Sequence, residues 1–275
     1  MNTSVPVPRS GVAQTRRASI RARMLALVRV EFILLLRNRT ALFNAVALAP
    51  LTVAFIAWTG ADAFLGRGED TAVAGMLPTM LATLALVVVV YYNLTTTFVS
   101  RREELVLKRL LTGEVSRAEI LTAYATPAVA ISTAQLVLGT VAMGLWWIAL
   151  PRVQNIVWLT IGLVGGIVLL VLLAAAGSGL TRTVETAQLT TLPMLAVATG
   201  LSGVFVPLSF LPDVVQAVAI WSPMYPVVTL IQHGLGAALP AGSTASGAQP
   251  LACLIAWLVV GVVALRHWMR WEPRR

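Results

Sequence analysis

Six long apolar stretches dominate this sequence and limit what it can fold into. They cover 41–60, 74–99, 118–149, 155–180, 187–211 and 251–266, and residues up to Trp268 can extend the last one. A helix needs about 20 residues to cross the hydrocarbon core of a bilayer, where only helices and closed barrels satisfy their backbone groups. Continuous runs such as 84–90 lack the two-residue alternation of barrel strands. The sequence therefore predicts an all-α integral membrane protein with six transmembrane helices.

The basic residues fall mainly in alternate loops. They collect before the first stretch, between the second and third, and after the last, whereas the opposite loops hold only Arg67 and Arg152. Because cytoplasmic loops carry the excess of Lys and Arg, we predict a multi-pass protein of the plasma membrane with both termini in the cytoplasm. This arrangement explains the net charge of +9 by topology and contact with membrane lipid, and it argues against a nucleic-acid partner.

Charge and length also divide the chain into regions. The segment 24–36 is apolar but too short to cross a membrane, and Arg29 and Glu31 interrupt it, so we expect it to lie in the cytoplasmic interface. The predicted regions are a basic cytoplasmic tail over 1–23, an interfacial connecting helix over 24–40, a six-helix transmembrane domain over 41–268 and a cytoplasmic tail over 269–275.

The residues that usually carry catalysis are scarce. Cys253 is the single cysteine, His233 and His267 lie at opposite ends of the predicted topology, and no zinc-hydrolase, serine-hydrolase, dinucleotide or P-loop motif occurs. We therefore predict no catalytic, cofactor or metal site on this chain and do not expect it to be an enzyme. Any ATP and Mg²⁺ would be bound by a separate subunit.

The predicted cytoplasmic loop 100–119 is the most patterned polar segment. Leu107, Leu110 and Leu111 recur at helical spacing, and acids precede bases, which predicts a short helix with an apolar stripe. Ser116 and Glu119 have the spacing of a capping box that opens the next helix. These residues alone leave two interpretations open: a solvated connector, or a docking element for a cytoplasmic partner.

Part of this loop resembles a known family. Arg102-Glu103, Leu107-x-Arg109-Leu110 and Val115-Ser116 are similar to the pattern R-E-x-G-x-L-x-R-L of ABC-2 type transporter permeases, the membrane subunits of ABC exporters. Two positions depart from the pattern, because Leu105 stands where Gly is common and Glu114 where Pro is common. The resemblance implies that the loop is a coupling helix that contacts an ATPase subunit. The coupling residues that it implies are Arg102, Glu103, Leu107, Arg109, Leu110 and Ser116.

A second match to the family lies after the fifth stretch. Its residues are Gly203, Pro207, Pro212, Pro223 and Pro226. Prolines break a helix at membrane depth, and the freed backbone groups must then be satisfied by protein or water. The resemblance implies an extracellular gate of short re-entrant or interfacial helices in a hairpin over 212–247.

Two intramembrane patterns have more than one interpretation. Tyr91, Tyr92, Asn93 and Thr96 form a polar patch on the second stretch that could line a transport path, bond across helices or bond its own backbone. Gly162 and Gly166 form a G-x-x-x-G pair, for which we favour packing within the chain over dimerisation.

Together these patterns lead to a functional hypothesis. The chain has no P-loop and no evident buried relay of acids, so uphill transport would need a separate ATPase. We expect a permease subunit of an ATP-driven exporter that pairs with a second copy or with a related permease. The expected substrate is hydrophobic or amphipathic. The family resemblance favours a drug or antibiotic as the substrate, and a lipid or glycan is the alternative. Competing classes are a stand-alone secondary transporter or channel and a membrane enzyme that acts on lipid.

Overall fold

The protein is helical wherever its structure is described. The computed structural model describes residues 20–37, 43, 47, 51–55, 58–59, 75–112, 115–145, 150–206, 208–237, 239, 247–269 and 271. Every regular element in these ranges is a helix. Within these described ranges, four helices are long and apolar enough to cross a membrane, namely Met76–Glu103, Arg117–Leu145, Ile156–Ser178 and Ala248–Trp268. The chain is therefore a multi-pass, all-helical membrane protein.

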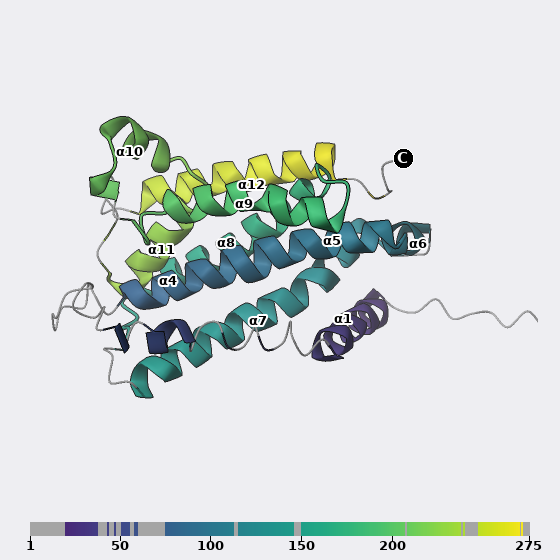
Figure 1. Ribbon diagram of the computed structural model, residues 1–275, viewed down its shortest axis with the longest axis horizontal. Helices are drawn as coiled ribbons and strands as arrows, with labels where there is room; N and C mark the ends of the chain where they lie inside the picture. Colours follow the sequence, from purple (N-terminus) through teal and green to yellow (C-terminus); the bar gives the residue numbers. More distant parts are fainter. Residues whose placement is uncertain are drawn as a thin grey trace, which may run out of the picture.

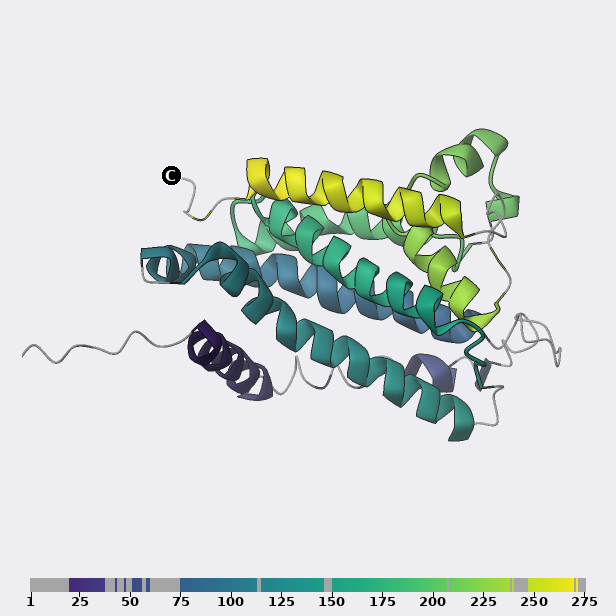
Figure 2. The same ribbon diagram turned by 180° about the vertical axis from the view of Figure 1, so that it is seen from behind.

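The long helices lie side by side in one elongated bundle (Figures 1 and 2). The first of them is continuous and consists of α4 (Met76–Leu84), a π-helical segment η1 (Ala85–Tyr92) and α5 (Asn93–Glu103). The others are α7 (Arg117–Leu145), α8 (Ile156–Ser178), α9 (Val184–Gly200) and α12 (Ala248–Trp268). Consecutive members run in opposite directions, and α1 (Ile20–Arg37) lies obliquely against α7.

Most predicted membrane stretches correspond to helices, with two exceptions. The first predicted stretch, 41–60, falls largely outside the described residues. The fifth was predicted to reach residue 211, but α9 ends at Gly200 and has 17 residues. The chain turns there because Gly200, Ser202 and Gly203 are poor helix formers, and Gly203 adopts a φ of 78° that favours glycine. The six-span layout stays a prediction.

Short helices connect α9 to α12 at one end of the bundle. They are η2 (Leu208–Phe210), α10 (Asp213–Ala219) and α11 (Tyr225–Leu235). Figure 1 shows α10 projecting from that end, whereas α11 turns back against the long helices. Nearly all of its side chains are buried, so α11 is an internal part of the bundle.

Helix α8 is the centre of the bundle, since it contacts α11, α12, η1 and α5. Its glycines allow α11 to approach closely: a Cβ added to Gly162 would lie 3.0 Å from the backbone nitrogen of Ile231. A Cβ added to Gly166 would lie 2.6 Å from Cγ1 of Val227. This confirms that the G-x-x-x-G pair packs within the chain.

The two ends of the bundle differ in charge. The end that carries α6 (Val106–Thr112) and the C-terminus in Figure 1 holds most of the described basic residues. They are Arg101, Arg102, Lys108, Arg109, Arg117, Arg182 and Arg266. We call this the basic end; the opposite end holds Arg152 and Asp213.

We expect Gly234→Ala to destabilise the bundle. A Cβ on Gly234 would lie 2.6 Å from the backbone nitrogen of Leu159 in α8, so α8 and α11 would have to separate. Overpacking of this kind costs about 1–3 kcal/mol. Gly200→Ala is the matched control, since a Cβ there meets nothing within 4 Å. Thermal unfolding in detergent should show a lower midpoint for the first variant only, and equal midpoints would contradict the close contact.

Candidate functional site at the basic end of the bundle

The basic end brings together five segments that are distant in sequence. The end of α5, the short helix α6, the start of α7, helix α1 and the turn from α8 to α9 meet there (Figures 1 and 2). The predicted coupling residues all belong to this end, whereas the gate residues that the structure describes, Gly203, Pro212, Pro223 and Pro226, lie at the other.

The predicted helix in the loop 100–119 is confirmed as α6, and its apolar stripe faces inward. Leu107 is buried in the main hydrophobic core, and Leu110 and Leu111 are half-buried against the same core. The chain enters α6 through Leu105, whose φ of 60° is the only positive value among the described non-glycine residues. This left-handed residue separates α5 from α6 and lets α6 change direction.

The predicted capping box at the start of α7 is also confirmed. The Ser116 backbone N–H donates to Oε2 of Glu119 over 2.9 Å, and the Glu119 N–H donates to Oγ of Ser116 over 3.2 Å. These bonds satisfy two backbone donors that a helix start leaves without partners. They define where the loop ends and α7 begins.

An exposed charged surface remains on the outer side of the α5–α6 junction. It consists of Glu103, Lys108 and Arg109, and we call it the docking face. The helix that carries Lys108 and Arg109 is anchored in the core by the buried side chain of Leu107. The docking face is therefore a set of exposed charges on a helix whose apolar side packs in the core.

Arg102 points into the protein although the next residue, Glu103, is exposed. Its side chain is 1% exposed. One terminal nitrogen, Nη1, donates to the Ser178 carbonyl over 2.7 Å. The other, Nη2, donates to the Thr181 carbonyl over 2.5 Å and to the Arg182 carbonyl over 3.5 Å. Arg102 therefore binds the end of α8 and the following turn. Of the two residues of the R-E pattern, Arg102 points into the protein and Glu103 is exposed.

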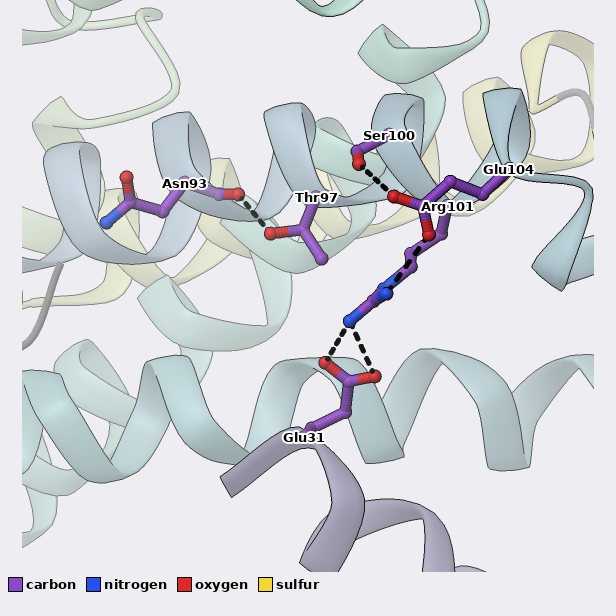
Figure 3. Close-up of polar contacts among 6 residues, drawn as sticks. All are labelled: Glu31, Asn93, Thr97, Ser100, Arg101 and Glu104. Atoms are coloured by element: carbon purple, nitrogen blue, oxygen red, sulfur yellow. Dashed lines mark hydrogen bonds and ion pairs between the residues drawn. The ribbon is translucent and has the colours of Figure 1, made fainter. Parts of the chain in front are cut away.

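Ion pairs attach α1 to this site. Arg101 lies 3.3 Å from Glu31 of α1 and 3.2 Å from Glu104, and Figure 3 shows its side chain extending from α5 to Glu31. A second pair joins Arg23 of α1 to Glu119 of α7 over 3.6 Å. Burial raises the pKa of the Glu31 carboxyl, and the adjacent Arg101 guanidinium opposes that shift.

Sequence reasoning missed these α1 contacts. Glu31 was noted only as an interruption of an apolar segment. The sequence did hold an indication of them, because Arg23 and Glu31 lie eight positions apart. At that spacing both fall on one side of α1, which the structure turns toward α7.

The polar patch of the second stretch lies on η1 and α5. Tyr91 is buried, Tyr92 is half-buried, and Asn93 is exposed on the surface of the chain. Thr96 donates to the Asn93 carbonyl over 2.9 Å, and Figure 3 shows the equivalent bond of Thr97. The threonine hydroxyls are thus satisfied within their own helix, which was one of the three interpretations. The role of this patch in transport stays a prediction.

The predicted gate residues have mainly backbone roles in the structure. Pro212 precedes α10, Pro226 lies in the first turn of α11, and Pro223 lies in the turn between these helices. Gly203 adopts its positive φ just after α9, and Pro207 lies outside the described residues. Among the described residues, no three His, Cys, Asp or Glu side chains gather where they could hold a metal ion.

We expect Leu105→Gly to stabilise the protein relative to Leu105→Ala. The left-handed conformation costs a residue with a Cβ about 1 kcal/mol, and glycine adopts it without that cost. Alanine keeps the penalty and, like glycine, removes the exposed leucine side chain, so it is the matched control. Thermal midpoints in detergent should rank glycine above alanine; the reverse order would show that this turn is not strained.

Comparison with known proteins agrees with the helical membrane fold. The model of the family described as ABC-2 type transporter matches residues 22–235, from α1 through α11. Curated proteins yielded no significant match. The family match spans well over half of the chain and includes the whole basic end except α12. The chain therefore belongs to the ABC-2 type transporter family.

Proposed function

We propose that this chain, an ABC transporter permease by its family, is the membrane subunit of an exporter driven by a separate ATPase. The observation that carries the proposal is the docking face, because its charges are exposed while the helix beneath them is anchored in the core. A partner that pushes on Glu103, Lys108 and Arg109 would move α6 as a unit, since Leu107 ties the helix to the bundle.

We propose different roles for the exposed and the buried coupling residues. Glu103 and Arg109 are exposed and would contact the ATPase. Leu107 and Leu110 would support α6 from the core side, and Ser116 would set the start of α7 through its capping box.

We place the basic end in the cytoplasm. Positive charge is retained on the cytoplasmic side of membranes. Outside α1, the described residues include eight arginines and lysines, and seven of them lie at the basic end. The exception is Arg152. In this layout 41–60 is the first span, 187–211 contains the fifth, and both termini are cytoplasmic. Helix α1 would lie in the interface, because its exposed face alternates Arg21, Leu25, Arg29 and Ile33.

The opposite end would then be extracellular. Helices α10 and α11 would form the hairpin between the fifth and sixth spans, with α11 re-entering the bundle against α8. We propose that the turns at Gly203, Pro212, Pro223 and Pro226, together with Pro207, are the outer gate. Because α11 is fixed to α8, movement of α8 would reach this gate directly.

Export requires a second permease. Asn93 is exposed on a helix that crosses the membrane, and a polar side chain facing lipid is costly. We therefore propose that this surface, with Tyr91, Tyr92 and Thr96 beside it, faces a transport path shared with a second copy of the chain; a related permease is the alternative partner. The apolar spans suit a hydrophobic or amphipathic substrate, with a drug or antibiotic favoured over a lipid or glycan.

Nucleotide would act only through the partner. Closure of the ATPase pair around ATP and Mg²⁺ would push on the docking face and switch the helices between inward- and outward-facing arrangements.

We expect the double variant Glu103→Ala/Arg109→Ala to weaken binding of the ATPase. The chain would be co-expressed with a P-loop ATPase of the same organism and purified through a tag on the permease. The variant should retain less ATPase and lower drug-stimulated ATP hydrolysis about tenfold or more, since removing a few charged contacts costs about 2 kcal/mol.

Arg152→Ala is the matched control, because it removes an exposed arginine at the opposite end. Unchanged binding by the double variant would contradict the docking assignment. Solute movement by the reconstituted permease alone, under an ion gradient, would favour a secondary transporter.

Cysteine labelling tests the topology. Cys253 would first be replaced by Ala, and single cysteines would be introduced at the exposed positions Thr112 and Asp213. A membrane-impermeant maleimide added to intact cells should label Asp213→Cys, whereas Thr112→Cys should react only after the cells are opened. Labelling of Thr112→Cys from outside would reverse the proposed orientation.

A further inference from the structure

A buried charge joins the two cytoplasmic connections of this chain. Arg102 is the last basic residue of α5, and its three carbonyl acceptors belong to Ser178, Thr181 and Arg182, more than 70 positions later in the sequence. The first connection is the segment that enters α6, and the second is the turn from α8 to α9. The contact therefore links the docking face to the helix at the centre of the bundle.

The chemistry of this contact favours arginine. The last carbonyls of a helix lack partners within it, and the helix dipole places partial negative charge there. A guanidinium has donors spread across a rigid plane, so its two terminal nitrogens can serve acceptors on several residues at once. A buried cation is stable only when such partners satisfy it. The position thus ties α5 to α8 through hydrogen bonds that a shorter or uncharged side chain cannot make.

The contact of Arg102 connects to α6 on one side and to α11 on the other. On one side, α5 leads within two residues into α6, which carries Lys108 and Arg109. On the other side, α8 holds α11 through its glycines. A displacement of α6 can therefore reach α11 through the hydrogen bonds that the Arg102 side chain donates to backbone carbonyls and through close helix contacts.

We propose that Arg102 is a positioning residue that makes the α5–α6 junction and the α8–α9 turn move as one unit. This inference rests on the proposed function, in which an ATPase pushes on the docking face. Arg102 does not contact the ATPase; it delivers the movement of α6 to α8, so that both cytoplasmic connections respond to one docking event.

The first test measures the distance between the two connections in the chain with native Arg102. Spin labels would be attached to Thr112→Cys, at the end of α6, and Glu185→Cys, at the start of α9, after Cys253→Ala. Both sites are exposed. Electron–electron double resonance on the complex with the ATPase should give one narrow distance that is the same without nucleotide and with ATP trapped. A distance that changes with nucleotide would overturn the inference.

The second test replaces the arginine. Arg102→Gln removes the charge and most donors, and Arg102→Lys restores the charge. We expect Arg102→Gln to keep ATPase binding, to broaden the label distance and to reduce drug-stimulated ATP hydrolysis at least fivefold, with partial recovery in Arg102→Lys. Arg266→Gln is the control, because it changes an exposed arginine at the same end.

The outcomes separate this inference from the proposed function. Loss of ATPase binding by Arg102→Gln would assign Arg102 to docking and overturn the positioning role. Full stimulation with an unchanged label distance would overturn it as well. Normal binding by Glu103→Ala/Arg109→Ala would instead contradict the docking face. If Arg102→Gln does not fold, the distance measurement with native Arg102 still decides the question.

Discussion

The close contact between α8 and α11 is the constraint on which the rest of the bundle depends. In a membrane, apolar side chains gain little by leaving lipid, so helices are held together by close packing and hydrogen bonds. Gly162 and Gly166 of α8 lie against Ile231 and Val227 of α11, and Gly234 of α11 lies against Leu159 of α8, which provides that packing. Because α8 also contacts η1, α5 and α12, the position of this one helix determines where the others can lie.

Ion pairs attach helix α1 to the rest of the bundle. The described ion pairs that join different helices, Arg101 with Glu31 and Arg23 with Glu119, both lie at the basic end and both involve α1. These two join α1 to α5 and to α7, so that a helix with an exposed apolar face stays attached to the same site as α6. The basic end is therefore a connected assembly of α1, α6 and the α8–α9 turn.

Local patterns in the sequence predicted local structure well. The leucine spacing predicted α6, and Ser116 with Glu119 predicted the capping box, because both depend on residues three or four positions apart. Leu105 departs from the family's glycine, and the structure shows a left-handed residue there, which explains why glycine suits the position. The end of α9 was placed too late because its apolar composition continues past Gly200, while the backbone turns at small residues.

Sequence by itself determined the membrane class, the alternation of charge and the resemblance to the ABC-2 family, since each depends on composition or short spacing. Tertiary structure alone decided that Arg102 is buried while Glu103 and Arg109 are exposed. A charged residue in a short loop is usually solvated, and nothing near Arg102 in the sequence indicates that carbonyls at the end of α8 will meet it. That contact exists because packing of α5 on α8 brings a helix end, with its unsatisfied carbonyls, to the guanidinium.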